Sequence, residues 1–280
     1  MRPVPTEQAP ALQRHSAGRV TVYLNPDCAA GVDVQALLDL PSALAALPGR
    51  STRQRGRTTS WEWPDGGAMV RLYAHGGLLG GLFGTRFLGA GRMLDEFRVH
   101  LHALRHGVPT SVPVALRIER RGPFVTAHFV TRKVVDAVDL MDLCADERAL
   151  LAAQRRRLAV AIAQAVARMH DAGILHADLN LRNILVRDPS GHPEVLIIDF
   201  DKARLRPELS LDDRLGNLYR LDRSAAKWPA TRRSIGLLDR LRVLRAYLAR
   251  YPQWRGRERE TARAYRGVPL RHRLSRAPLL

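Results

Sequence analysis

Lysine is nearly absent from this basic sequence. Only Lys133, Lys202 and Lys227 occur, so arginine supplies almost all of the 45 basic residues, which outnumber 27 acidic ones. Cysteine is also scarce: Cys28 and Cys144 lie far apart and have no partners at metal-ligand spacing. A disulfide framework or a zinc site therefore does not fit this chain.

Long apolar runs are missing too. No stretch reaches the roughly 18 uncharged apolar residues of a membrane-spanning helix. The first residues, 1–18, are polar, contain Pro3 and Pro5, and lack an apolar signal core. We therefore expect a cytoplasmic chain that begins with a frayed leader over residues 1–18.

Positive charge is concentrated toward the C-terminus. The formal net charge is +18, and residues 228–280 hold fourteen arginines against Asp239, Glu258 and Glu260. Such a segment suits nucleic acid, an anionic membrane surface or an acidic substrate. The alternative is a solvated basic surface from a genome that favours arginine codons.

The apolar pattern predicts a β-rich first half and a helical second half. Strands are expected at Val20–Leu24, Thr59–Trp63, Ala68–Tyr73, Val112–Ile118 and Phe124–Arg132. One helix is expected over Met93–His106, and the arginine-rich stretch Gly49–Gly56 is expected to be a loop. In the second half, helices are expected over Gln154–Ala172, ended by Gly173, and from about Ser234 to Tyr251. This pattern predicts an α+β fold of two lobes, residues 19–135 and 136–280.

The chemically informative stretch runs from His176 through Asp178 to Asn183. Sixteen residues after Asn183, the apolar strand Val195–Ile198 ends in Asp199. Phosphoryl transfer needs a carboxylate that accepts the proton of the attacking hydroxyl, and hard oxygen ligands that hold Mg²⁺ on the phosphates. Asp178 suits the first task, and Asn183 with Asp199 suits the second. The strands 184–187 and 195–198 are expected to form a hairpin that brings Asp199 beside Asn183.

This order of residues resembles the protein-kinase-like superfamily. H-x-D-x-x-x-x-N, followed by a strand that ends in D-F-D, is similar to the catalytic and metal loops of those enzymes. The resemblance implies a two-lobed protein-kinase-like fold and the use of ATP and Mg²⁺. Seen singly, each residue has another explanation, since Asp178 could cap a turn and His176 could be a core histidine.

The resemblance also implies a phosphate-binding basic residue on a strand and a helical glutamate that holds it. Arg71 and Glu96 occupy these positions, although the family residue is usually lysine. A surface ion pair between them is the alternative. Gly56 is the only candidate for a phosphate-covering turn before Arg71. The glycine-rich residues 76–81 are interpreted as a flexible connection.

The residues within these motifs narrow the resemblance to one family of the superfamily. Val70-Arg71-Leu72-Tyr73 with Gly76-Gly77, His176-Ala177-Asp178-Leu179-Asn180, Ile198-Asp199-Phe200-Asp201 and Asn217–Ser224 are similar to the 3-deoxy-D-manno-octulosonic acid (Kdo) kinases. The resemblance covers roughly residues 20–228, and His75 stands where that family tends to have arginine. It implies transfer of the ATP γ-phosphoryl group to a hydroxyl, the 4-OH, of Kdo on lipid A.

The same resemblance implies a lipid-linked sugar as substrate and an anionic membrane as partner, at the cytoplasmic face of the inner membrane. It leaves no role for nucleic acid and says nothing of oligomeric state. Two alternatives remain open from the residues alone. One is another small-molecule kinase, of the heptose or aminoglycoside type. The other is a catalytically inactive kinase fold that binds membrane or RNA through its basic surface.

Overall fold

The computed structural model describes residues 12–45, 52–55, 58–62, 67–75, 84–145 and 150–254. The described chain divides into two compact units. The first contains the residues up to His102 together with Ser111–Val135, and the second contains Ala103–Thr110 and the residues from Asp136 onward. Helix α4 (Gly91–Arg105) therefore begins in the first unit and ends in the second.

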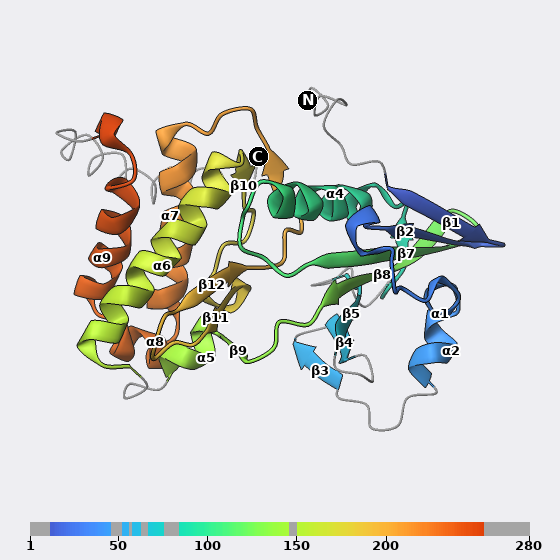
Figure 1. Ribbon diagram of the computed structural model, residues 1–280, viewed down its shortest axis with the longest axis horizontal. Coiled ribbons are helices and arrows are strands. Elements are labelled where there is room, and N and C mark those ends of the chain that lie inside the picture. The colour runs from blue at the N-terminus through green and yellow to red at the C-terminus, as the bar shows by residue number, and fades with distance from the viewer. Residues whose placement is uncertain are drawn as a thin grey trace, which may run out of the picture. The chain divides into compact units, whose positions relative to one another are not determined.

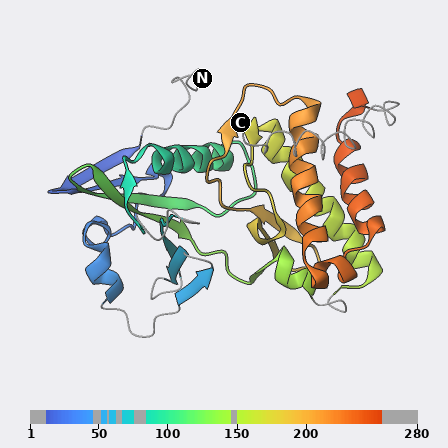
Figure 2. The ribbon, with the colours of Figure 1, turned by 180° about the vertical axis from the view of Figure 1, so that it is seen from behind.

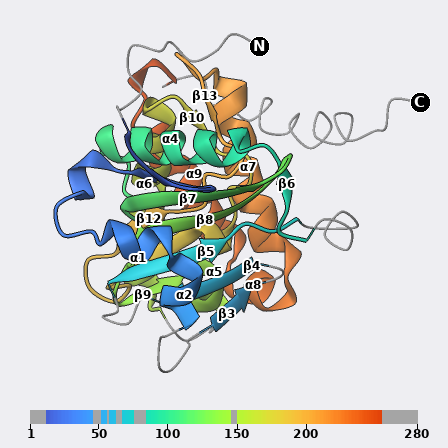
Figure 3. The same ribbon diagram turned by 90° about the vertical axis from the view of Figure 1, so that its right-hand side faces the viewer.

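An antiparallel sheet makes up most of the described part of the first unit. In sheet order its strands are β1 (Gln13–Ala17), β2 (Val20–Leu24), β7 (Pro113–Arg121), β8 (Phe124–Arg132), β5 (Ala68–Leu72), β4 (Thr58–Glu62) and β3 (Thr52–Arg55), with the short β6 (Phe87–Leu88) also paired to β8. Figure 3 shows β7, β8, β5, β4 and β3 following one another across this sheet. The five strands predicted for this half are confirmed, and so is the helix predicted over 93–106.

Two sequence predictions for this unit are wrong. Residues 13–17 of the expected leader form β1, and the arginine-rich stretch 49–56, expected to be a loop, contains β3. Both are edge strands, which bury fewer apolar side chains than central strands. Their sequences, QRHSA and TRQR, therefore lack the alternation by which a strand is recognised. The rest of the predicted leader that precedes residue 12 lies outside the described residues.

Helices cover both faces of the sheet. Met93, Phe97 and Leu101 lie four residues apart on α4, are fully buried, and pack on one face. The opposite face is covered by α1 (Val34–Leu38) and α2 (Leu40–Ala45). Strand β5 therefore lies in a sheet whose side chains are fixed from two sides, which suits a strand that positions a functional residue.

The second unit is mainly helical. Its described helices are α5 (Leu140–Ala145), α6 (Ala152–Asp171), α7 (Leu211–Lys227), α8 (Pro229–Ser234) and α9 (Leu237–Leu248). Figures 1 and 2 show α6, α7 and α9 running side by side. The helices predicted over 154–172 and from about 234 are confirmed. Helix α7 is not among the predicted elements, although Ser210 and Asp213 form a capping box at its start.

Two small sheets of short strands hold the loops that follow α6. One small sheet joins β9 (Ala137–Asp139), β11 (Ile184–Arg187) and β12 (Glu194–Ile197), and a second joins β10 (Ile174–Leu175) and β13 (Arg204–Leu205). The predicted hairpin of strands 184–187 and 195–198 is confirmed, with Ile184 opposite Ile197. The hairpin places the residues before β11 next to those after β12.

A glycine fixes the point at which the chain leaves α6. Gly173 has φ +72°, and a Cβ atom at this position would lie 2.1 Å from the carbonyl oxygen of Arg206. Only glycine adopts this conformation cheaply, and only glycine avoids the collision. The predicted end of the helix at Gly173 is confirmed, and the chain enters β10 directly afterwards.

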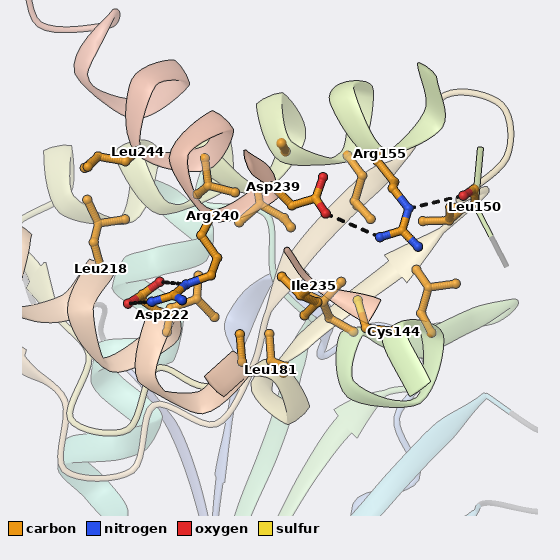
Figure 4. Close-up of a pocket in the computed structure, with 18 residues that line it drawn as sticks. Cys144, Leu150, Arg155, Leu181, Leu218, Asp222, Ile235, Asp239, Arg240 and Leu244 are labelled. Carbon is orange, nitrogen blue, oxygen red and sulfur yellow. Dashed lines mark hydrogen bonds and ion pairs between the residues drawn. The ribbon is translucent and has the colours of Figure 1, made fainter. Parts of the chain in front are cut away.

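An apolar pocket lies among α5, α6, α7 and α9 of the second unit (Figure 4). Its apolar lining includes Leu143, Leu158, Ile162, Leu218, Leu221 and Leu244. Two ion pairs border it: Arg155 lies 3.4 Å from Asp239, and Arg240 pairs with Asp222. Among the described residues, no helix is both long and apolar enough to span a membrane.

Candidate active site

In the first unit, Arg71 and Glu96 form an ion pair. Arg71 lies on β5 and Glu96 on the buried face of α4, and the Nη2 atom of Arg71 donates to Oε1 of Glu96. The other carboxylate oxygen, Oε2, accepts a hydrogen bond of 2.6 Å from the hydroxyl of Tyr73. The predicted pairing of a strand arginine with a helical glutamate is therefore present, and Tyr73 is a partner that the sequence analysis missed.

The ion pair between Arg71 and Glu96 is more buried than a surface ion pair. The Glu96 side chain is 1% exposed and that of Arg71 is 26% exposed. A buried carboxylate needs partners for both oxygens, because an unpaired buried charge is costly. The guanidinium also lies over the rings of Tyr73 and Phe129, at 4.9 and 5.6 Å from their centroids. A freely solvated surface pair, the alternative interpretation, does not match this burial.

Replacement of Arg71 by methionine should destabilise the protein. It would remove the guanidinium from the buried Glu96 carboxylate and leave the hydrogen bond from Tyr73 in place. We expect the free energy of unfolding to fall by about 3 kcal/mol, the lower end for breaking a buried pair, since Arg71 is partly exposed. The matched control is Arg98→Met on the same helix, where Arg98 and Asp95 form a solvent-exposed pair at 3.6 Å. Urea denaturation should show a loss below about 0.5 kcal/mol for the control, and equal losses would contradict the prediction.

Gly56, proposed from sequence as a phosphate-covering turn, lies outside the described residues, as do residues 76–81. His75, the departure from the family pattern, is described. Its ring stacks on Phe87 at 4.0 Å between centroids, and its Nε2 atom lies 2.8 Å from the carbonyl oxygen of Arg86. His75 is therefore held against β6.

In the second unit, His176 connects the two loops that carry the candidate catalytic and metal residues. Its Nδ1 atom accepts a hydrogen bond of 3.1 Å from the backbone N–H of Asp178. Its Nε2 atom lies 3.2 Å from the carbonyl oxygen of Ile198, to which it donates. Burial lowers the pKa of this imidazole, which agrees with one nitrogen accepting and the other donating. A neutral His176 thus fixes the backbone on both sides of the site.

The same contacts bring Asn183 beside Asp199. The backbone N–H of Ile198 donates to the carbonyl of Asn183 at 3.0 Å, and the Nδ2 atom of Asn183 donates to the carbonyl of Asp178 at 2.9 Å. Asp199 follows directly and has a left-handed backbone, φ +66°. A non-glycine residue in this region often marks a functional turn. The sequence-predicted residues Asp178, Asn183 and Asp199 are therefore gathered on two loops joined by His176.

These residues fit a magnesium ion that is held partly by phosphates. No group of three His, Cys, Asp or Glu side chains among the described residues could hold a metal ion alone. Mg²⁺ in phosphotransferases usually takes one or two protein ligands, with phosphate oxygens and water filling the other positions. Asp199 offers a carboxylate. Because the Nδ2 atom of Asn183 already donates to Asp178, its Oδ1 atom is the one left to a cation.

Helix α7 holds the catalytic loop at two points that the sequence analysis missed. Oδ1 of Asn217 accepts from the N–H of His176, and its Nδ2 donates to the carbonyl of the same residue, both at 3.0 Å. Further along the loop, Oγ of Ser224 accepts from the N–H of Leu181 at 3.1 Å. Both residues belong to the stretch 217–224 that carried part of the family resemblance, and that stretch was the available signal.

A buried polar chain supports Asn217 from behind. The hydroxyl of Tyr247, on α9, lies 2.7 Å from Nδ1 of His170, whose Nε2 lies 3.3 Å from Oδ1 of Asn217. Burial lowers the pKa of His170 to about 3, so this imidazole stays neutral. It then donates to Asn217 and accepts from Tyr247. Helices α6, α7 and α9 are thereby connected to the catalytic loop through hydrogen bonds.

Asn217→Leu should therefore damage catalysis without touching the reacting groups. We expect kcat to fall on the order of 10²-fold, because a displacement of about 1 Å in a catalytic group has that effect. Asn217→Asp keeps the acceptor for the N–H of His176 and should lie between native and Asn217→Leu. Steady-state kinetics with saturating co-substrate would measure both. Unchanged kcat in Asn217→Leu would contradict the proposed support of the loop.

Two arginines near this site differ in their surroundings. Arg182, in the loop, lies 3.8 Å from Asp142, and both side chains are about half exposed. Such a pair contributes little to stability. Arg204 is exposed on β13. Neither guanidinium is fixed by a close, buried ion pair that the structure records.

Residues 43–247 match the family described as "Lipopolysaccharide kinase (Kdo/WaaP) family". The chain belongs to this family. The match extends past residue 228, the end of the resemblance in the sequence motifs, and it reaches Tyr247. Helices α8 and α9 are therefore within the family region of this Kdo/WaaP kinase.

Curated relatives agree with this assignment. The chain is 34% identical over 178 residues to a 3-deoxy-D-manno-octulosonic acid kinase of Vibrio parahaemolyticus, with 61% of this chain and 71% of that protein covered. It is 30% identical over 198 residues to the enzyme of that name from Vibrio cholerae, with 69% and 80% covered. A third, from Xanthomonas euvesicatoria, is 34% identical over 200 residues, with 69% and 76% covered.

A solved structure described as "WaaP in complex with acyl carrier protein" has the same fold. The TM-score is 0.56 at 24% sequence identity, with 81% of this chain and 90% of that chain covered. The predicted α+β, protein-kinase-like fold is confirmed. The family and its named members identify the chain as a kinase, so the interpretation as a catalytically inactive binding module is not supported.

Proposed function

We propose that this Kdo/WaaP-family kinase transfers the γ-phosphoryl group of ATP to a ring hydroxyl, the 4-OH, of Kdo on a lipid A precursor. The observation that carries the proposal is the joining of Asp178, Asn183 and Asp199 through His176, in a chain whose relatives are named Kdo kinases. The choice of the 4-OH rests on the resemblance of the motifs to Kdo kinases.

In this proposal Asp178 orients the acceptor hydroxyl and takes its proton as the new O–P bond forms and the bond from the γ-phosphorus to ADP breaks. Its side chain is exposed and its backbone is held at both the N–H and the carbonyl. Asn183 and Asp199 hold Mg²⁺ on the phosphates. The bound ion would neutralise charge on the phosphate oxygens and orient them.

The first unit has a separate role in the proposal. Arg71, fixed by Glu96 and Tyr73, binds nucleotide phosphates. Arginine offers a planar fork where the lysine of other kinases offers a point charge. Arg182 and Arg204 are proposed to bind the Kdo carboxylate, since arginine binds carboxylates bidentately.

The test uses purified enzyme, γ-labelled ATP, Mg²⁺ and two lipids: a Kdo–lipid A precursor and the same lipid without Kdo. We expect label only in the Kdo-bearing lipid, and phosphorus NMR of the product should place it on the 4-OH. Label in both lipids, or only in an added heptose- or aminoglycoside-containing acceptor, would contradict the Kdo assignment and favour the other small-molecule kinase classes.

The location proposed for this reaction is the cytoplasmic face of the inner membrane. The acceptor is lipid-linked, and a chain of net charge +18 is attracted to anionic head groups. The fourteen arginines of residues 228–280 would contribute to this attraction. The proposed function gives nucleic acid no role.

A lipid-related partner is also part of the proposal. The solved neighbour was obtained with an acyl carrier protein, and the pocket of Figure 4 has an apolar lining that suits an alkyl chain. Ala159, in that lining, is 4% exposed, so Ala159→Phe would reduce the space. Binding of fatty-acylated carrier protein to the native chain, lost in Ala159→Phe, is expected by calorimetry. Equal binding by both would contradict it.

A further inference from the structure

Large apolar side chains are exposed together at one end of the helical unit. Seven such side chains are exposed among the described residues, and four of them, Leu151, Trp228, Leu237 and Leu238, occupy helix ends in the second unit. Their exposed fractions are 72, 45, 66 and 68%. Figures 1 and 2 show the start of α6, the end of α7, α8 and the start of α9 at the same end of the bundle.

Polar contacts hold these helix ends together. The guanidinium of Arg155 donates to the carbonyl of Leu150 at 3.2 Å and lies 3.4 Å from Asp239 (Figure 4). It also donates to the carbonyl of Ser234 at 2.5 Å. This connects the residue before Leu151 with the first turn of α9. The buried Thr231 donates to the carbonyl of Ala225 at 2.9 Å, which ties α8 to α7. The exposed apolar side chains therefore stand on a fixed scaffold.

The surroundings of these side chains are basic. Lys227, Arg156, Arg232 and Arg233 are exposed at the same helix ends, and Nζ of Lys227 lies 5.0 Å from the centroid of the Trp228 ring. Over residues 222–242, from the last turns of α7 through α8 to the first turns of α9, the sequence has six basic residues and two acidic ones. Both acidic residues, Asp222 and Asp239, are in ion pairs with arginines. The net field at this end of the bundle is therefore positive.

We propose that this apolar–basic surface, made by Leu151, Trp228, Leu237 and Leu238 with their basic neighbours, docks on an anionic lipid bilayer. Leucines that enter the acyl boundary, a tryptophan at its border and cations against the head groups are the arrangement of interfacial membrane-binding segments. The inference deepens the proposed function, on which it rests: it identifies where the kinase meets the membrane that carries its acceptor.

The leucines distinguish this surface from a merely basic one. Attraction of arginines to head groups, or to an acidic protein, requires no exposed apolar side chains. Large apolar side chains exposed at the same end of a helix bundle carry a cost in solubility and usually mark an interaction site. Insertion of Leu237 and Leu238 into a bilayer would remove these apolar side chains from water. The surrounding cations would favour a bilayer with anionic head groups.

The experiment measures sedimentation of the full chain with vesicles of phosphatidylcholine mixed with phosphatidylglycerol. In Leu237→Glu/Leu238→Glu we expect the partition coefficient to fall at least about tenfold, at low and high salt alike. In Arg232→Gln/Arg233→Gln it should fall about 25-fold at low salt, because each basic residue near the surface contributes about fivefold. That loss should shrink at high salt, where charges are screened.

The matched control is Leu88→Glu, which changes an equally exposed leucine (76%) of the first unit and should bind like the native chain. Thermal unfolding would verify that the variants fold. Native-like binding by Leu237→Glu/Leu238→Glu, an equal loss in Leu88→Glu, or equal binding to vesicles of phosphatidylcholine alone would overturn the proposal. So would binding to an acidic protein with none to vesicles.

A second assay keeps this inference separable from the proposed function. Phosphorylation of a soluble Kdo oligosaccharide without lipid should be unchanged in both surface variants, while phosphorylation of vesicle-borne acceptor should fall with vesicle binding. Failure of the native enzyme to phosphorylate either acceptor would overturn the Kdo function, and the vesicle data would still decide the docking surface.

Discussion

Asp178→Asn is expected to reduce turnover by on the order of 10²–10⁴-fold, the usual effect of losing general-base assistance. The amide keeps the size of the side chain, so the loop held by His176, Asn183 and Asn217 should keep its shape. Binding of Mg²⁺–ATP should stay within a few-fold of native, because Asp178 is not assigned to the metal. Single-turnover kinetics and nucleotide titration would measure the two quantities separately.

The matched control for this change is Glu194→Gln. It converts another carboxylate of the second unit to an amide, in an exposed ion pair with Arg187. Near-native turnover is expected there, since exposed pairs contribute little. A control as slow as Asp178→Asn, or an Asp178→Asn enzyme with nearly native turnover, would remove Asp178 from the role of base.

Asp199→Asn is expected to act through the metal. It removes the one carboxylate assigned to Mg²⁺, and stabilisation of phosphoryl transfer by a metal ion is worth several kcal/mol. We expect kcat/KM to fall on the order of 10²–10³-fold, with a higher Mg²⁺ concentration needed for half-maximal activity. The measurement is a Mg²⁺ titration of initial rates at fixed ATP.

The pattern across variants separates the two roles. Asp178→Asn should leave the Mg²⁺ dependence unchanged, and Asp201→Asn, two residues beyond Asp199, should have a smaller effect on it. The assignment of the metal would be wrong if Asp199→Asn and Asp178→Asn shifted the Mg²⁺ dependence equally. It would also be wrong if Asp201→Asn shifted it more than Asp199→Asn.

Local sequence patterns were enough to predict the elements that position the site. The spacing of Met93, Phe97 and Leu101 predicts α4, and the hairpin that follows Asn183 predicts the approach of Asp199 to the catalytic loop. These predictions succeed because each depends on neighbours in sequence. The pair of Arg71 with Glu96 came instead from the superfamily resemblance, which places two residues 25 positions apart in contact.

The missed features depend on contacts distant in sequence. Asn217 lies 41 residues from His176, and nothing in its immediate neighbourhood marks it as a partner of that backbone. Tyr73 fits the apolar pattern of its strand, and that pattern does not reveal that its hydroxyl donates to Glu96. The edge strands β1 and β3 obtain their stability from paired backbone, which composition does not reveal.

The two hydrogen bonds between Asn217 and the backbone of His176 also make the loop's protection from solvent depend on helix α7. In amide hydrogen exchange, the N–H groups of His176 and Leu181 can exchange only when Asn217 and Ser224 withdraw. Their exchange rates therefore report opening of the contact between the loop and α7. Fraying of that helix would inactivate the enzyme while the rest of the chain stays folded.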